Sequence, residues 1–184
     1  WLEARGLLYP CFASRTEIET VAKPGAVDPD GAPLYPGLHK RMPGSEIEAR
    51  MQNGERFALR IDMDRALTMA RERLGGAPLT FTEIDATGTH HVVEAHPERW
   101  GDAVILRKDV PASYHLAVVV DDARQGVTHV TRGSDLYAAT DLHRLLQVLL
   151  GLPEPAYHHH RLLADAEGRK LSKSAGDIGL AELR

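Results

Sequence analysis

Two lysines near the end of the sequence, Lys170 and Lys173, have the spacing of a polyanion-binding loop. They lie in a Lys-Leu-Ser-Lys-Ser segment that follows a glycine at position 168. Ammonium groups, the Ser172 hydroxyl and backbone N–H groups can there face one polyphosphate. Phosphoryl and nucleotidyl transfer use such groups, because catalysis depends mainly on positioning and on neutralising charge on non-bridging oxygens. The alternative on spacing alone is a solvated basic loop.

The histidine runs are weaker candidates for chemistry. His158, His159 and His160 are consecutive, and the pair His90-His91 is similar. Consecutive side chains of a strand point to opposite faces, so three in a row do not converge on one metal ion. We therefore expect no metal site at either run.

Composition is that of an ordinary globular protein. The 184 residues are 43% hydrophobic and 26% charged, with a net charge of -4. A single cysteine excludes an internal disulfide and favours a reducing cytoplasm. No apolar run approaches the ~20 residues that cross a bilayer, so no membrane association is expected. The first residue is Trp1 rather than methionine, and we interpret the chain as a fragment.

The elements that position the lysine loop have an α/β pattern. Residues 103–106 and 127–130 are predicted strands, and Leu136 to Leu150 is a predicted helix with one leucine stripe. Tyr114 to Asp122 is a long apolar run that periodicity leaves open between strand and helix. Alternating strands and helices predict a partial Rossmann-like, doubly wound parallel sheet, in which ligands lie beyond the carboxyl ends of the strands.

The preceding residues predict a smaller, mixed region. A strand is expected near residues 7–12, and a short helix from Thr16, its candidate N-cap, to Ala22. Proline and glycine concentrate between residues 23 and 44. We expect four segments: 1–22, the end of a first Rossmann half and the start of a zinc-type loop; 23–102, an inserted small α+β subdomain; 103–160, the second half; and 161–184, the lysine loop with the start of a helical region.

Three stretches together resemble the class I aminoacyl-tRNA synthetases of the glutamyl branch. The Lys-Leu-Ser-Lys-Ser loop resembles their signature loop. Tyr-His-Leu-Ala-Val-Val-Val-Asp-Asp, from Tyr114, resembles the segment with a substrate-binding tyrosine. Val-Thr-His-Val-Thr-Arg-Gly-Ser-Asp, which contains Arg132, resembles the strand and turn with a substrate-binding arginine. They cover about half of the chain in the order and approximate spacing of the family.

The resemblance implies roles for these residues. Lys173, assisted by Lys170, would neutralise charge as a glutamate carboxylate attacks the α-phosphorus of ATP. Ser172, Leu162 and Leu163 would also contact ATP, although the two leucines are equally well explained as core. Arg132 would grip a carboxylate of glutamate through its planar fork, and Tyr114 would hydrogen-bond the same substrate.

Structural alternatives remain open for the two glutamate-binding residues. Arg132 can instead form an ion pair with Asp135. Tyr114 can be a buried aromatic residue whose hydroxyl is satisfied inside the protein.

The N-terminal part is more similar to a group of shortened paralogues, the glutamyl-queuosine tRNA(Asp) synthetases. Their Tyr-Pro-Cys-x-Cys and Tyr-Pro-Gly-x-Cys stretches can bind zinc, and Tyr-Pro-Cys-Phe-Ala and Tyr-Pro-Gly-Leu-His stand here. Cys11, Tyr35 and His39 remain as candidate ligands, whereas Ala13 replaces a cysteine. A closed structural site uses four ligands, so we favour a metal-free loop.

The resemblance implies an ATP-dependent ligase that uses Mg²⁺, activates glutamate and transfers it to the queuosine base in the anticodon stem-loop of tRNA(Asp). We expect a cytoplasmic monomer. No His-x-Gly-His-type ATP motif occurs in the sequence. The fragment should therefore lack part of its nucleotide site and be poorly active alone. The alternatives are the catalytic domain of a glutamyl-tRNA synthetase, which charges a tRNA 3′ end, and a non-catalytic RNA-binding relative.

Overall fold

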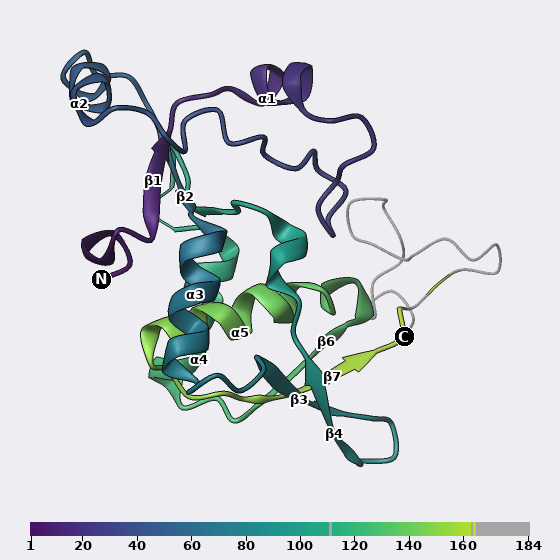
Figure 1. Cartoon of the computed structure of the whole chain (residues 1–184). Helices are drawn as coiled ribbons and strands as arrows, with labels where there is room; N and C mark the ends of the chain where they lie inside the picture. The colour runs from purple at the N-terminus through teal and green to yellow at the C-terminus, as the bar shows by residue number, and fades with distance from the viewer. Residues whose placement is uncertain (111, 163, 165–184) are drawn as a thin grey trace.

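The computed structural model describes residues 1–110, 112–162 and 164, which form two β-sheets joined by helices (Figure 1). The first sheet is antiparallel, with the strand order β1-β2-β5. Its members are β1 (Leu8–Cys11), β2 (Ala58–Ile61) and β5 (Val104–Leu106). The strand predicted near residues 7–12 is therefore present, and it pairs with a segment about fifty positions later in the chain.

The second sheet is mostly parallel, in the order β4-β3-β7-β6. β7 pairs in parallel with both β3 and β6, and only the edge strand β4 is antiparallel to its neighbour. The members are β3 (Thr80–Ile84), β4 (His90–Glu94), β6 (His129–Gly133) and β7 (Ala156–His160). The predicted α/β class with a mostly parallel sheet is confirmed.

Helix α5 (Ala139–Leu150) connects β6 to β7 and forms the centre of the core. It packs against α3 (Met63–Arg73), α4 (Tyr114–Gln125) and strand β3. Four of the five leucines of its predicted stripe are fully buried, and Leu150 is partly buried, because a 3.6-residue period places these side chains on one face. The fully buried ones are Leu142, Leu145, Leu146 and Leu149.

The apolar run that begins at Tyr114 is a helix. The Ser113 hydroxyl accepts a hydrogen bond from the Leu116 N–H, and Gly126 ends the helix with a positive φ of 69°. Its valines would suit a strand equally well, so packing against α5 decides the conformation. Strand β6 begins two residues later than predicted and continues to Gly133, which places Arg132 inside the strand rather than after it.

The N-terminal part adds short elements around the first sheet. Helix α1 (Arg15–Val21) and the loop after it lie at the end of the molecule away from the β3–β4 hairpin (Figure 1). The prediction that Thr16 is the N-cap is wrong. Ser14 is the N-cap of α1 and forms a reciprocal pair of hydrogen bonds with Glu17. The remaining elements are η1 (Glu3–Arg5), α2 (Gly44–Gln52), η2 (Pro97–Trp100) and η3 (Ser134–Leu136).

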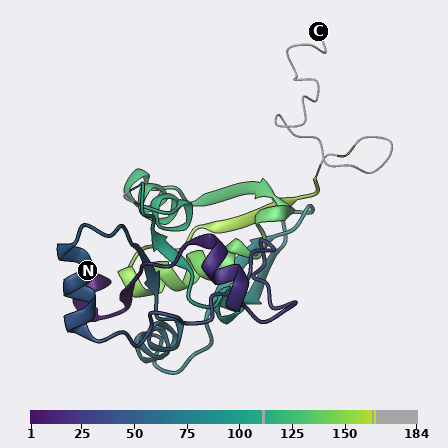
Figure 2. The same cartoon turned by 90° about the horizontal axis from the view of Figure 1, so that it is seen from above.

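Strands from different expected segments pair within one sheet. Strand β3 belongs to the segment 23–102, yet it pairs with β7 of the segment 103–160. Strand β7 also lies beside β6 (Figure 2). The four-segment division remains a prediction, and the structure adds that these two parts have a common sheet. Within the described part of the chain, no helix combines the length and the apolar character needed to cross a membrane.

Candidate active site

Arg132 occupies a buried position between strand β7 and helix α5. The parallel register places it beside His159, and the first turn of α5 brings Thr140 and His143 to the same point. Arg132 Nε donates to His159 Nε2 at 3.0 Å, and Nη2 donates to Thr140 Oγ1 at 2.6 Å. Nη1 lies 3.1 Å from His143 Nδ1. The guanidinium is thus held on three sides.

The donor character of arginine determines the protons of both histidines. A guanidinium only donates, so His159 Nε2 and His143 Nδ1 must accept. The other nitrogen of each ring then carries the proton. His159 Nδ1–H donates to Glu83 Oε2 at 2.8 Å, and His143 Nε2–H donates to His115 Nδ1 at 3.1 Å. Both imidazoles are therefore neutral.

Burial agrees with this assignment. It lowers the pKa of His143 to about 2, and repulsion from the neighbouring Arg132 charge acts in the same direction. Burial also lowers the pKa of His159, although Glu83 opposes this shift. The contact between His159 and Glu83 is accordingly a hydrogen bond from a neutral ring rather than an ion pair.

The charge of Arg132 is left without a direct counter-ion among the described residues. None of the ion pairs that these residues form includes Arg132, and Glu83 lies one imidazole away. The Tyr157 ring centre lies 5.1 Å from the guanidinium carbon and supplies an aromatic face. The described residues use three of the five guanidinium N–H groups and leave one on each terminal nitrogen. That pair suits a carboxylate bound through both oxygens.

Tyr114, the first residue of α4, approaches the same cluster from the other side. Its ring lies 5.8 Å from the His143 ring and 5.6 Å from the His115 ring. Half of its surface is exposed, so it is not the buried core aromatic that we considered as an alternative. Tyr114 and Arg132 therefore both contact His143. Tyr114 also lines a cavity of about 340 Å³ with Trp100 and Arg60.

Leu162 is the one predicted ATP-contacting residue within the described part of the chain. It is half-buried and lies against Gly133, at the end of β6. A Cβ at Gly133 would come within 2.9 Å of Leu162 Cδ2, so a larger residue there would require the Leu162 side chain to shift. Lys170, Ser172, Lys173 and Leu163 lie outside the described residues.

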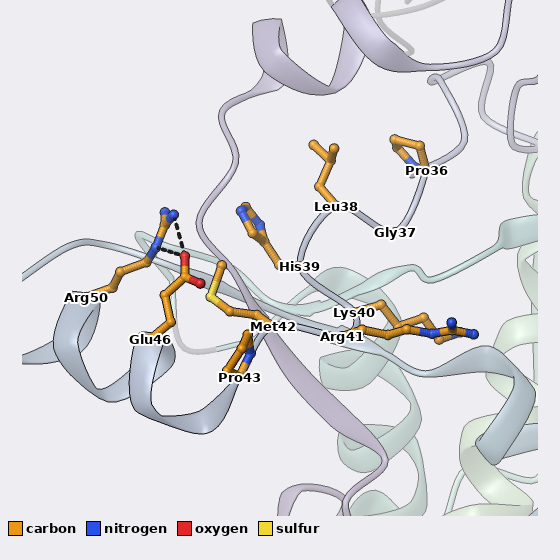
Figure 3. Close-up of a pocket in the computed structure, with 10 residues that line it drawn as sticks. All are labelled: Pro36, Gly37, Leu38, His39, Lys40, Arg41, Met42, Pro43, Glu46 and Arg50. Carbon is orange, nitrogen blue, oxygen red and sulfur yellow. Dashed lines mark hydrogen bonds and ion pairs between the residues drawn. The ribbon is translucent and has the colours of Figure 1, made fainter.

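Cys11, Tyr35 and His39 lie together near the end of β1. Cys11 and Tyr35 share a small buried cluster, and the Tyr35 hydroxyl accepts the His39 backbone N–H at 2.9 Å. His39 Nδ1 accepts a hydrogen bond from the Phe12 N–H at 3.3 Å. Figure 3 shows the His39 ring on the side of Glu46 and Arg50, whereas Lys40 and Arg41 point away from it.

This donor set does not fit the zinc site for which it was considered. His39 Nδ1 already binds a backbone N–H, and burial together with the Cys11 neighbour raises the pKa of Tyr35, so its phenol stays protonated. Among the described residues, no group of three or more His, Cys, Asp or Glu side chains could hold a metal ion. One thiol and one imidazole leave a structural zinc ion short of ligands. Hydrogen bonds hold this loop instead.

The consecutive histidines of β7 make separate contacts. His158 Nδ1 lies 2.7 Å from the Ile84 carbonyl oxygen, and His160 Nδ1 lies 2.9 Å from that of Arg161. Only His159 joins the Arg132 cluster. Sequence reasoning missed Thr140, His143 and His115 altogether. One signal could have found two of them. Thr140 and His143 lie three positions apart near the start of a helix, and this spacing places both side chains on one face.

Comparison with known proteins gives a consistent picture. The family model described as tRNA synthetases class I (E and Q), catalytic domain, matches residues 2–181. A glutamyl-Q tRNA(Asp) synthetase of Rhodobacter capsulatus is 43% identical over 98% of the chain, and one of Symbiobacterium thermophilum is 38% identical over all of it. The chain spans 63% and 52% of the lengths of these two relatives.

Two further similarities concern glutamate–tRNA ligases. Glutamate–tRNA ligase 2 of Nitrosococcus oceani is 37% identical, and the chain covers 36% of its length. The solved structure of a glutamate tRNA ligase from Elizabethkingia meningosepticum, in complex with its amino acid, superposes with a TM-score of 0.61. It covers 92% of this chain and 32% of the other at 22% identity, which shows a shared fold.

Proposed function

Because this chain belongs to the class I tRNA synthetase family of the E and Q type, we propose that it activates glutamate with ATP and transfers it to the queuosine base of tRNA(Asp). The observation that carries the proposal is the buried guanidinium of Arg132, whose described partners are all neutral acceptors. Such a site attracts a carboxylate. The two relatives named glutamyl-Q tRNA(Asp) synthetase support the choice of acceptor.

The proposed first step joins glutamate to AMP. An oxygen of the reacting carboxylate attacks the α-phosphorus, the bond to the bridging oxygen breaks, and pyrophosphate leaves. Arg132 holds the other carboxylate of glutamate, and Tyr114 hydrogen-bonds the same substrate. Lys173 and Lys170 neutralise the charge that builds on the phosphate oxygens, with Mg²⁺ as cofactor. Ser172, Leu162 and Leu163 contact ATP.

The second step transfers the activated amino acid. A nucleophile on the queuosine base attacks the carbonyl carbon of the mixed anhydride, and AMP leaves. We further propose that the protein works in the cytoplasm as a monomer and meets tRNA(Asp) through the anticodon stem-loop.

The full-length protein decides between this function and its alternatives. Glutamate-dependent exchange of pyrophosphate into ATP tests the first step. Labelled glutamate is then offered with tRNA(Asp) that either contains or lacks queuosine, and with tRNA that lacks its terminal adenosine. Label that requires queuosine but not the terminal adenosine supports the proposal. Label that requires the adenosine supports a glutamate–tRNA ligase, which the 37% identical relative makes the second candidate. No exchange by folded protein leaves a non-catalytic RNA-binding relative.

Substitution of Arg132 by lysine tests the carboxylate site directly. Lysine keeps the charge but lacks the fork, so kcat/KM for glutamate should fall about 100-fold, while the KM for ATP changes less than about threefold. Arg124→Lys, an exposed arginine at the other end of α4, is the matched control. Exchange kinetics supply both constants. An unchanged KM and kcat for glutamate in folded Arg132→Lys would remove Arg132 from the substrate site.

A further inference from the structure

Two hollows adjoin one another and share part of their lining, and the outer one lies against α1. The outer hollow has a volume of about 810 Å³ and lies between α1, β2 and the end of β5. The inner hollow of about 340 Å³ reaches Tyr114 and His115. We call the two together the basic groove. The residues that line both hollows are Asp30, Ala32, Pro33, Arg60, Val104 and Arg107.

Cations outnumber carboxylates in the outer hollow, although the whole chain has a net charge of -4. The cationic residues are Arg15, Arg56, Arg60, Arg107 and Lys108. Arg15 and Arg107 form exposed ion pairs with Glu19 and Asp109. The only other carboxylate in its lining is that of Asp30. The inner hollow adds a fourth carboxylate, Asp28, so the excess of positive charge lies in the outer hollow.

Three of these cations bind only neutral groups among the described residues. Arg56 Nη2 donates to the Lys108 carbonyl oxygen at 2.9 Å, and Lys108 Nζ donates to that of Phe12 at 2.6 Å. Arg60 Nη1 donates to the Asp102 carbonyl oxygen at 2.8 Å, and its buried Nε has no hydrogen-bond partner. A carbonyl oxygen orients a cation without cancelling its charge. These side chains are therefore positioned for an anion that comes from outside.

The inner hollow has the aromatic surfaces that suit a nucleobase. Tyr35, Trp100 and Tyr114 line it, and the guanidinium of Arg60 lies 4.0 Å from the centre of the Tyr35 ring. Aromatic rings stack on bases, and cationic side chains follow the phosphates of a single strand. The inner end also leads to the amino acid site, because Tyr114 contacts His143, which binds Arg132.

We propose that the basic groove binds the single-stranded loop of an RNA hairpin, with phosphates at Arg56, Arg60 and Lys108 and the acceptor base turned into the inner hollow beside Tyr114. This inference rests on the proposed transfer of glutamate to a base. A base inside a duplex cannot reach a buried acyl group, so the acceptor must leave its stack. The groove provides a path of matching chemistry from the protein surface to the activated carboxyl group.

The test measures binding of a synthetic tRNA(Asp) anticodon stem-loop to the full-length protein between 50 and 200 mM salt. Arg56→Gln and Lys108→Gln should each weaken binding about threefold to tenfold and reduce the slope of log affinity against log salt by about one. The double variant should lose about two units of slope. Arg124→Gln, an exposed arginine outside the groove, is the matched control and should bind like the wild type.

Each outcome bears on one claim. The proposal that the groove binds RNA would be overturned if both variants kept the affinity and the salt slope of the wild type. It would also be overturned if Arg124→Gln lost as much affinity as they do, or if the protein bound a duplex of the same length as tightly as the stem-loop. Because Lys108 donates a hydrogen bond to the Phe12 carbonyl oxygen, its variant could unfold. In that case the binding of Arg56→Glu alone tests the groove, because Arg56 is exposed and its substitution should not disturb the fold. A wild-type protein that binds RNA through the groove but lacks glutamate-dependent exchange would overturn the proposed function and leave the groove standing.

Discussion

Arg132 shows how a buried charge is kept available for a substrate. Its described partners are a hydroxyl and two imidazoles, all of which accept without carrying negative charge. A carboxylate in the same place would satisfy the guanidinium and compete with glutamate. Glu83 stabilises the arrangement from behind His159. The described residues thus orient the guanidinium firmly without cancelling its charge.

His143 should make the protein sensitive to acid. The unfolded chain protonates this ring below about pH 6.5, whereas the folded protein holds its pKa at about 2. Between these values the unfolded state binds more protons, so stability is lost as the pH falls. The contribution is about 1.4 kcal/mol per pH unit, or about 2 kcal/mol between pH 6.5 and 5. Burial lowers the pKa of His115 and His159 too, which acts in the same direction.

Two variants of His143 separate this effect from simple packing. Glutamine can accept from Arg132 and donate to His115, so His143→Gln should keep the KM for glutamate within about threefold and show a weaker loss of stability at pH 5. His143→Ala should raise that KM about tenfold or more, because Arg132 loses an acceptor. Urea unfolding at pH 7 and pH 5, with exchange kinetics, measures both. Identical acid sensitivity in His143→Gln and the wild type would contradict the assignment.

At the scale of elements, Asp102 ties the N-terminal region to helix α3. Its carboxylate accepts from the Tyr9 hydroxyl at 2.6 Å, from Lys40 Nζ at 3.2 Å and from the Met63 N–H at 2.9 Å. Lys40 also pairs with Asp62 and with Asp64, whose side chain is 89% exposed. The carboxylate of Asp102 is buried. If it were removed, water could not take its place as the acceptor for these partners.

Substitution of the buried Asp102 should therefore lower the free energy of unfolding much more than substitution of the exposed Asp64. Asp102→Asn removes the acceptor of Tyr9 and the charge beside Lys40, and should lower the free energy of unfolding by about 2–4 kcal/mol. Asp64→Asn removes an exposed partner of the same lysine and should cost less than about 1 kcal/mol. Urea unfolding of both variants provides the comparison. Equal effects would show that the Asp102 cluster adds no more than a surface ion pair.

At the scale of the whole molecule, helix α5 unites the two sheets. Its leucines belong to one core cluster with Ile61 of β2 and Ile105 of β5, and α5 also packs on β3 of the second sheet. The same helix carries Thr140 and His143 into the active site. The site and the core therefore depend on one element, and the molecule should unfold as one unit.

Leu145→Ala tests this unity. The side chain is fully buried, so its truncation should cost about 2–5 kcal/mol through lost burial and the cavity left behind. Because the core is shared, tryptophan fluorescence and far-ultraviolet circular dichroism should follow one coincident transition in the variant as in the wild type. Leu38→Ala, at a largely exposed leucine, is the control and should change stability little. Separate transitions would show that the two sheets unfold independently.

Local sequence determined a large part of this protein. The leucine period predicted α5, and the β-like runs predicted β1, β5 and the first two residues of β6. Tyr114 and Arg132 were identified from residue types and family resemblance. These features depend on side-chain periodicity and short motifs, which neighbouring residues specify.

Tertiary structure decided the rest. The run after Tyr114 became a helix because α5 offered it a packing surface, and β4 formed from residues that had indicated no element. The cluster of His143, Thr140 and His159 around Arg132 exists only when β6 and β7 pair in parallel register and α5 crosses beside them. Local patterns do not encode that register, because it is set by contacts between residues far apart in the chain. The neutral acceptors that leave Arg132 charged are thus a property of the fold.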